Sequence, residues 1–227
     1  MTYKTSISNQ TSDMDHQAKY DLIAEHWIQH RSKLPEKDTL LFNELMGLLP
    51  ERATILDLGC GSGAPIAAAL YQKGHTVIGV DRSEKLLHQA RQQLPNATFI
   101  QSDLESLNIQ SLLNDGQEKK LKNIQAVICW DALFHLPRHH QAELLKHIAS
   151  TITRGVHLLI TSGGLKTDHP PFTDLMFGVE FYYDSFPIPE LIHFCDSIGL
   201  KVISQSMLNT PDGERDKGRV GLLLQKA

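Results

Sequence analysis

The amino-acid sequence predicts an α/β protein with a three-layer, Rossmann-like fold. Its sheet is expected to have seven strands, mostly parallel, with an antiparallel last strand. Two observations carry this prediction. Short apolar runs alternate with longer segments of helical period between residues 53 and 161, as in strand–helix–strand units. The last two apolar runs, at 200–206 and 219–225, have no helix between them, so we expect them to pair as an antiparallel hairpin.

The N-terminal part of the chain is predicted to be helical after a short tail. Residues 1–14 are polar and are expected to form a loose tail. Apolar and aromatic side chains recur at helical spacing in residues 15–31, and a leucine-rich second helix stops at Pro50. We expect residues 15–50 to form a helical lid on one domain spanning 15–227, because no composition shift marks a domain boundary.

The remaining elements follow from the apolar period and from glycine, proline and serine positions. Gly74 is expected to close a helix in the left-handed conformation, and Ser83 to cap the start of the next. Residues 163–188 hold glycine and proline pairs and are expected to be an irregular insert near the substrate. Besides the final pair, the expected strands are 53–58, 75–80, 97–101, 124–130 and 156–161, and the expected helices are 64–73, 84–94, about 107–113, 138–153 and 190–198.

Composition and charge exclude several classes of protein. The 227 residues carry a formal net charge of −4, whereas a nucleic-acid binder usually shows a basic face. The basic cluster at 119–122 is expected to be a solvated loop rim. No apolar run approaches the roughly 18 residues that a membrane helix needs, and no signal peptide is visible. Three distant cysteines form neither a disulfide framework nor a CxxC pair. We therefore expect a cytoplasmic protein with no nucleic-acid or membrane partner, and the oligomeric state is left open.

A glycine-rich loop between the first predicted strand and the following helix is the strongest functional signal. The glycines of residues 55–64 permit a tight turn and a close approach of a ligand to the backbone. Free N–H groups at a helix start favour polar or anionic ligand groups. Asp81 ends the second strand, where a carboxylate can accept hydrogen bonds from both ribose hydroxyls. Together these features predict a nucleoside-containing ligand at the carboxyl ends of the strands.

The loop alone does not separate one nucleoside cofactor from another. Gly59-x-Gly61-x-x-Ala64 also satisfies the looser dinucleotide fingerprint, so an NAD(P)-dependent oxidoreductase stays an alternative. The chain has no Tyr-x-x-x-Lys pair, which argues against a short-chain dehydrogenase. The glycines are also compatible with a tight turn that binds nothing.

Four segments, in the right order and spacing, resemble the class I S-adenosylmethionine-dependent methyltransferases. Residues 57–63 (Asp-x-Gly-x-Gly-x-Gly) resemble the first motif of that family, and residues 79–83 resemble the second. Residues 99–104 are similar to the segment that contacts adenine, and residues 126–136 to the fourth-strand motif. The resemblance extends from about residue 15 to the C-terminus and implies S-adenosylmethionine as the cofactor and S-adenosylhomocysteine as the product.

The resemblance also implies a role for each matching residue. Asp81 would hold the ribose, Asp103 would bind the exocyclic amine of adenine, and the Leu104 amide would face a ring nitrogen. Backbone carbonyls at the end of the fourth strand, at Trp130, would take the methionine ammonium. The other cofactor-binding candidates are Arg82 and the loop residues Asp57, Gly59, Cys60, Gly61 and Gly63.

The first predicted helix resembles the one that covers the cofactor in many small-molecule methyltransferases. Tyr20 and Trp27 are seven residues apart and share one face. They either wall the methionine end of the cofactor or pack as core, and both roles stay open. Arg31 is expected to be a solvated surface residue, with pairing to the cofactor carboxylate as the alternative.

His135 is the candidate general base, and its alternative is a structural role as a helix cap or space filler. It comes just after the fourth strand, where the methyl group should point, and histidine titrates near neutral pH. Asp131, four residues earlier, is assigned to the substrate. His139 and His140 are expected to be exposed. Without an HExxH motif or a cysteine cluster we expect no metal.

The insert after the fifth strand is rich in aromatic side chains, and in the resembling family this region closes over the methyl acceptor. We assign Tyr182 and Tyr183 to a pocket for a flat or apolar acceptor. Phe181 and Phe186 are expected to pack the insert onto the sheet.

The expected function is in-line transfer of a methyl group from S-adenosylmethionine to an oxygen, nitrogen or carbon nucleophile of a small molecule. The protein would supply position and electrostatics, and a base is needed only if the acceptor loses a proton. A non-catalytic S-adenosylmethionine-binding module is the second alternative. The sequence names neither the acceptor nor the acceptor atom.

Overall fold

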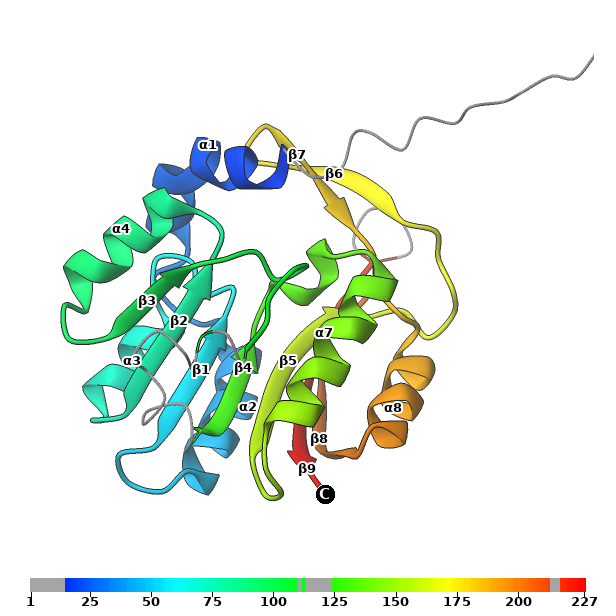
Figure 1. Cartoon of the computed structure of the whole chain (residues 1–227). Coiled ribbons are helices and arrows are strands. Elements are labelled where there is room, and N and C mark those ends of the chain that lie inside the picture. The colour runs from blue at the N-terminus through cyan, green and yellow to red at the C-terminus, as the bar shows by residue number, and fades with distance from the viewer. Residues whose placement is uncertain (1–14, 110–111, 113–123, 213–216) are drawn as a thin grey trace, which may run out of the picture.

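The computed structural model describes residues 15–109, 112, 124–212 and 217–227. The predicted tail, the basic cluster and part of the short helix expected at about 107–113 lie outside the described residues. The main sheet has seven strands in the order β3-β2-β1-β4-β5-β9-β8 (Figure 1). Only β9 runs antiparallel to its neighbours, so the predicted sheet is confirmed. The strands are β1 Thr54–Leu58, β2 Thr76–Asp81, β3 Thr98–Gln101, β4 Ile124–Cys129, β5 His157–Gly163, β8 Leu200–Asn209 and β9 Arg219–Lys226.

Helices cover both faces of the sheet and complete the three layers (Figure 1). Helices α2 and α3 pack in one apolar cluster, and α7 and α8 pack in the other. The strands supply both clusters because successive side chains point to opposite faces. In β4, for example, Ala126 and Ile128 face α2 and α3, whereas Val127 and Cys129 face α7. The helices are α1 Asp15–His30, α2 Glu36–Leu48, α3 Ile66–Gln72, α4 Glu84–Gln93, α7 Arg138–Thr151 and α8 Ile188–Ser197, with a short 3-10 turn, η1, at Leu133–His135.

The expected helix ends are confirmed at two positions. Gly74 follows α3 with a φ of 84°, the left-handed conformation that glycine adopts readily. The Ser83 hydroxyl accepts a hydrogen bond from the Leu86 N–H at 3.2 Å and caps α4. Helix α3 begins at Ile66, two residues later than predicted, with Pro65 as its N-cap.

The insert at residues 163–188 differs from the prediction. We expected it to be irregular, but it contains an antiparallel hairpin of β6 Phe172–Met176 and β7 Val179–Tyr183. The two-residue turn, Phe177-Gly178, has φ values of 50° and 79°, as a type I′ hairpin turn requires. Phenylalanine is an uncommon residue at the first of these positions, so the usual Asn-Gly or Asp-Gly signal was missing.

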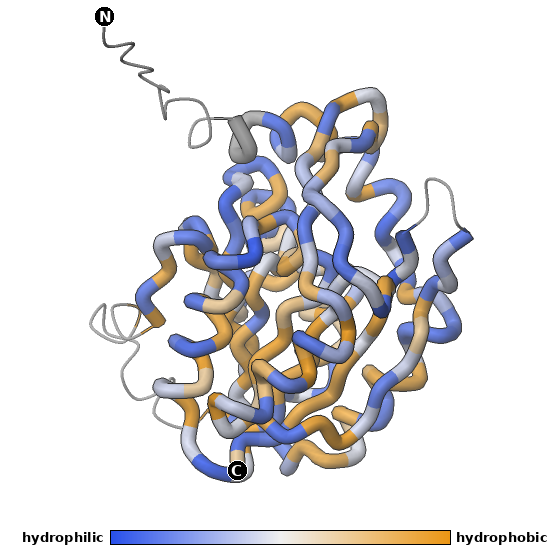
Figure 2. The backbone as a smooth tube through the Cα atoms, turned by 90° about the vertical axis from the view of Figure 1, so that its right-hand side faces the viewer, coloured by the Kyte–Doolittle hydropathy of each residue, from blue (hydrophilic) through white to orange (hydrophobic). Residues whose placement is uncertain are grey.

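The hairpin and α1 lie above the ends of β1, β2 and β4, at the top of Figure 1. In Figure 2 the hydrophobic segments gather along the central strands and the helix faces turned toward them. Within the described residues, no helix is long and apolar enough to cross a membrane.

Gly79 in the centre of β2 is expected to tolerate no side chain. A Cβ there would meet Phe99 at 2.6 Å and the Cys60 sulfur at 2.7 Å. Gly79→Ala should therefore destabilise the protein by about 1–3 kcal/mol, the usual effect of overpacking. Gly47 in α2 is the matched control, since a Cβ there meets nothing within 4 Å. Gly47→Ala should stabilise by up to about 1 kcal/mol through helix propensity. Urea unfolding of both variants checks this pair, and an unchanged midpoint for Gly79→Ala would contradict the packing.

Candidate active site

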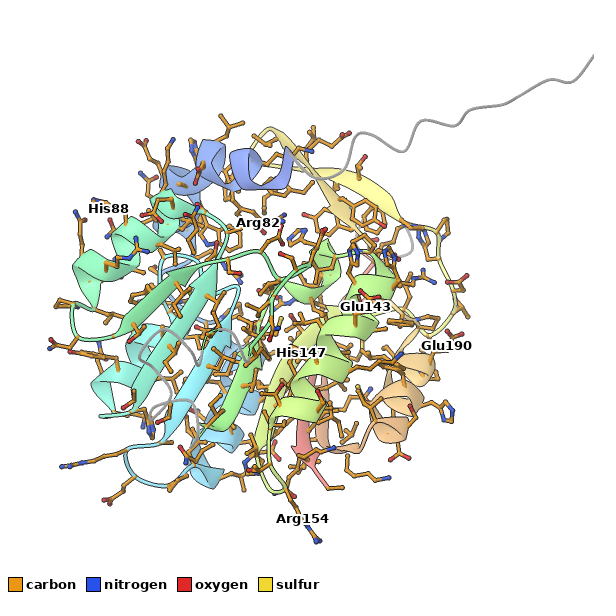
Figure 3. All side chains as sticks on the ribbon, in the orientation of Figure 1. Arg82, His88, Glu143, His147, Arg154 and Glu190 are labelled. Carbon is orange, nitrogen blue, oxygen red and sulfur yellow. The ribbon has the colours of Figure 1, made fainter. Side chains whose placement is uncertain are left out.

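A cleft opens at the carboxyl ends of β1, β2 and β4, beneath α1. About 620 Å³ of empty space lies in and above it, part of which is open to solvent. Arg82, labelled in Figure 3, lines its β2 side. Leu86, Ala132 and Leu136 also line it, and nothing in their type distinguishes them from core residues. The predicted site residues that line the cleft are Tyr20, Trp27, Gly59, Gly61, Asp81, Arg82, Asp103, Leu104, Trp130, Asp131 and His135.

The glycine loop brings the backbone to the cleft surface. Gly59 and Gly61 have φ values of 75° and 55°. A Cβ on Gly59 would lie 2.4 Å from the Cβ of Ala132, and one on Gly61 would lie 3.3 Å from the Trp27 Nε1. The N–H groups of Gly59 and Cys60 donate to the Val80 carbonyl at 2.8 and 3.0 Å. This part of the loop is thus anchored to β2 and leaves no room for side chains.

Asp81 holds the loop and the start of α4 together. Its carboxylate accepts hydrogen bonds from the N–H of Gly61 at 2.8 Å and from the N–H of Ser83 at 2.9 Å. Burial raises the pKa of Asp81, and these two hydrogen bonds oppose that rise. A carboxylate offers about four acceptor positions, so this one can accept further hydrogen bonds from a ligand.

A second buried carboxylate lies close to the first. Asp57 is 3% exposed, and burial together with the nearby charge of Asp81 raises its pKa to about 7. Asp57 and Cys60 line a smaller cavity that shares Gly59, Gly61, Trp27 and Trp130 with the main cleft. The prediction placed both residues at the cofactor, and the structure places them in this side cavity.

Arg82 and Asp103 form an ion pair across the β2 side of the cleft. Asp103 also accepts the Glu105 N–H at 3.1 Å, which fixes the carboxylate at the start of the loop after β3. Sequence analysis singled out both residues but not their contact.

Asp131 lies at the centre of a charged network beside the cleft. Its carboxylate pairs with Arg31 and, at 2.8 Å, with the Nε of Arg219. Arg219 pairs in turn with Asp38 in α2, which also accepts the indole N–H of Trp130 at 3.1 Å. The expectation of a solvated Arg31 is therefore wrong, because its side chain is 26% exposed and ion-paired.

His135 faces the cleft from η1. Its Nδ1 lies 3.0 Å from the Tyr182 carbonyl oxygen, which can only accept, so Nδ1 carries the proton. In the neutral ring the lone pair is then on Nε2. The ring packs against Tyr20 at 5.8 Å and Tyr183 at 4.8 Å between centroids. His135 does not cap the next helix, since the N-cap of α7 is Pro137.

The C-terminal end of β7 is fixed against the start of α7. Asp184 accepts hydrogen bonds from the backbone N–H of Arg138 at 3.0 Å and from its Nε at 2.7 Å. The Gln141 side chain donates to the carbonyls of Leu136 and Asp184 at 2.7 and 2.8 Å. Sequence analysis assigned no role to Arg138, Gln141 or Asp184.

The aromatic residues of β7 alternate as strand geometry requires. Phe181 is fully buried against Tyr20, as expected of a packing residue. The Tyr182 hydroxyl donates a hydrogen bond to Asp184 at 3.3 Å, and the Tyr182 carbonyl accepts one from His135. Tyr182 does not line the cleft. Tyr183 lines a second pocket next to the cleft. Phe186, expected to pack the insert onto the sheet, instead stacks on Phe194 in α8.

Helix α1 forms the roof and is tied to α4. The Ser83 hydroxyl donates to the Asp21 carboxylate at 2.5 Å, and Lys85 Nζ donates to the Asp21 carbonyl at 3.1 Å. Tyr20 and Trp27 meet edge to face at 5.8 Å. Burial, then the charge of Asp81, raises the pKa of Tyr20, so its hydroxyl stays protonated.

Three residues considered in the sequence analysis, Gly63, His139 and His140, do not line the main cleft. Gly63 packs toward Ala90 and Phe99, where a Cβ would come within 3.4 and 3.6 Å, and does not line the cleft. His139 is exposed as expected, but His140 is half-buried with its Nδ1 3.5 Å from Glu105. Among the described residues, no group of three or more His, Cys, Asp and Glu could hold a metal ion.

The raised pKa of Asp57 predicts a pH-dependent stability in the protein without ligand. Between the unfolded pKa near 4 and the folded pKa of about 7, the folded state binds more protons. The free energy of unfolding should therefore fall as pH rises through this window, by at most about 1.4 kcal/mol per pH unit, and level off above 7.

Asp57→Asn should reduce this slope, while Asp196→Asn, which replaces an exposed carboxylate on α8, should leave it unchanged. Urea unfolding at several pH values between 4 and 8 measures both. Parallel curves for the wild type and Asp57→Asn would show that Asp57 ionises at an ordinary pH.

Comparison with known proteins gives one consistent family. A family model described as a methyltransferase domain matches residues 55–155. The ubiquinone biosynthesis O-methyltransferase of Coxiella burnetii is 25% identical over 192 residues, which cover 80% of this chain and 75% of that protein.

Solved structures agree in fold. The magnesium protoporphyrin IX methyltransferase of Synechocystis matches with a TM-score of 0.66 at 18% identity, over 97% of this chain and 100% of that one. The CcbJ methyltransferase of Streptomyces caelestis matches with a TM-score of 0.67 at 17% identity, over 94% and 99%.

The matched segment contains the glycine loop, Asp81, Asp103 and His135, which the fold brings to one cleft. Over most of their length, both matching structures share the fold of this chain. The matched family model, the relatives and the fold together support an enzyme of the class I S-adenosylmethionine-dependent methyltransferase type.

Proposed function

We propose that this enzyme methylates a small molecule, and that the cleft beneath α1 holds S-adenosylmethionine with its methyl group directed toward His135. The observation that supports this most is the position of His135 on the same cleft as the glycine loop, Asp81 and Asp103. The Coxiella burnetii relative, named as an O-methyltransferase of ubiquinone biosynthesis, also favours a small-molecule acceptor.

The residues of the cleft fit such a cofactor. Gly59 and Gly61 have no side chain, so a ligand can approach the backbone there. We assign Asp81, which has further acceptor positions, to two ribose hydroxyls, and Asp103 and the Leu104 amide, which line the same cleft, to the adenine. Tyr20 and Trp27 would cover the cofactor from above.

The methionine end would lie toward the side cavity. Arg31 lines that cavity and stands 5.0 Å over the Trp27 ring, so we assign it to the methionine carboxylate. The backbone at Trp130 and the carboxylate of Asp131 would face the ammonium group.

The chemistry requires an aligned acceptor and, for a protonated acceptor, a base. S-adenosylmethionine supplies the activated methyl group. When the bound cofactor gave its methyl group to the acceptor, S-adenosylhomocysteine would be the leaving group, and Nε2 of His135 would take up the proton that the acceptor loses. The Tyr182 carbonyl fixes the tautomer that makes Nε2 the base. Holding the acceptor in line supplies several kcal/mol through effective concentration.

Loss of the Asp81 carboxylate should weaken cofactor binding. Asp81→Ala removes the partner of two ribose hydroxyls and frees the Gly61 and Ser83 N–H groups, so affinity for S-adenosylmethionine should fall by about 1–3 kcal/mol. Calorimetric titration measures this affinity, with replacement of the exposed Asp196 on α8, Asp196→Ala, as the control. Equal affinity of the wild type and Asp81→Ala would remove Asp81 from the cofactor site.

Replacement of His135 should separate catalysis from binding. His135→Gln keeps a donor for the Tyr182 carbonyl but has no basic nitrogen, so turnover should fall by about 10²-fold or more. S-adenosylhomocysteine affinity should stay within about twofold, because the residue is assigned to the acceptor side. Product formation with the first acceptor found by screening measures turnover, and exposed His139→Gln is the control. Equal turnover of His135→Gln and the control would leave His135 with a structural role.

A further inference from the structure

A second and larger pocket lies beside the cofactor cleft, between the β6–β7 hairpin and the start of β9. It encloses about 940 Å³ of empty space that opens to solvent. Sequence analysis singled out only one residue of its lining, Tyr183. The other lining residues are Phe134, Gly163, Phe172, Asp174, Asp184, Ser185, Asp212, Lys217, Gly218 and Arg219.

Three aromatic rings form one side of this pocket. Tyr183 stacks on Phe172 with centroids 5.3 Å apart and planes 14° apart, and on Phe134 at 6.0 Å and 24°. The three nearly parallel rings come from β6, β7 and η1. Such a wall favours a planar ring, because aromatic pairs gain energy in offset-stacked or edge-to-face contact beyond the area that they bury.

The pocket meets the cofactor cleft at two contacts. The Tyr183 ring packs on His135, which lines the cleft, at 4.8 Å. Arg219 of the pocket pairs with Asp131 of the cleft at 2.8 Å. A molecule lying along the aromatic side therefore ends beside His135, at the boundary between the two spaces.

Among the described residues, the remaining lining is polar and carries three carboxylates and two cations. The cation of Arg219 is compensated by Asp38 and Asp131, and the carboxylate of Asp184 by Arg138. A long aliphatic chain would remove water from these charged groups and offer them no hydrogen bond in return. A polyanion would meet three carboxylates in the same lining. The chemistry suits a planar ring with hydroxyl or amino substituents.

The hairpin that carries two of the three rings is held in place. The ion pair of Arg138 with Asp184 and the backbone N–H of Asp184 on the Phe134 carbonyl at 2.9 Å join β7 to η1 and α7. The pocket is thus formed before a ligand binds, which reduces the entropy lost on binding.

We propose that this second pocket is the acceptor site and that the acceptor is a planar aromatic compound carrying a hydroxyl or amino group. The assignment rests on the proposed function, since it takes the methyl group to lie in the neighbouring cleft. The reacting atom is then a ring substituent presented to His135.

Phenol and cyclohexanol form a matched pair of probes, because they differ in the planar ring and share the hydroxyl. Backbone amide chemical shifts are followed in ¹⁵N-labelled protein during titration with each probe, with and without saturating S-adenosylhomocysteine. Phenol should shift the amides of Phe172, Tyr183, Ser185 and Gly218, and should bind at least about fivefold more tightly than cyclohexanol.

Two variants on the same strand locate the probe. Phe172→Ala removes one ring of the wall and should weaken phenol binding at least about threefold. Leu175→Ala changes an exposed side chain on the opposite face of β6 and should leave it unchanged. Circular dichroism and urea unfolding establish that both variants are folded.

The outcomes separate this inference from the proposed function. Equal binding of phenol and cyclohexanol, shifts confined to other surfaces, or equal effects of the two variants would overturn the aromatic acceptor site. The titration without S-adenosylhomocysteine decides this by itself. Failure of S-adenosylhomocysteine to shift the amides of Gly59 and Gly61 would instead overturn the assignment of the cofactor cleft.

Discussion

The ion-pair network at Asp131 is the interaction on which the cleft, its roof and the second pocket all depend. Asp131 follows β4 with a φ of 55°, a backbone conformation that side chains rarely adopt outside constrained sites. Its carboxylate joins Arg31 beyond the end of α1 to Arg219 of β9, and Arg219 continues to Asp38 of α2. Loss of one member would leave a buried charge unpaired, so these four elements are held in one arrangement.

In the protein without ligand, two buried carboxylates lie unfavourably close to each other beneath the glycine loop. Asp57 and Asp81 are both buried, and the charge of Asp81 disfavours ionisation of Asp57. Within the described part of the chain, backbone N–H groups stabilise the charge of Asp81 but not that of Asp57. A ligand that donates hydrogen bonds to Asp81 would favour the charged form further. Binding and the shape of the loop are therefore coupled through one carboxylate.

Two separate sets of hydrogen bonds hold the elements around His135 in place. Helix α1 is fixed to α4 through Asp21, and the hairpin is fixed to α7 through Asp184 and Arg138. His135 lies between these supports, with its ring held by the Tyr182 carbonyl. Functional groups held by packed elements and by further hydrogen bonds keep their geometry better than groups on unsupported loops.

Local patterns in the sequence were sufficient to predict the order of the elements and the residues that the strand ends bring to the site. Strands and helices differ in apolar period, and the carboxyl ends of parallel strands share one edge, so Gly59, Asp81 and Trp130 were expected to meet. The hairpin was missed because its turn uses Phe177 where Asn or Asp is usual.

The pairings that complete the site were decided only by the tertiary structure. Arg31 and Asp131 are 100 residues apart, and Asp38 and Arg219 are 181 apart. No periodicity or short motif relates residues at such separations, because their contact depends on how whole elements pack. The sequence by itself determined the sheet, the glycine loop and the candidate base. Packing decided which charges meet, which aromatic rings form a wall, and that the cleft has a second pocket beside it.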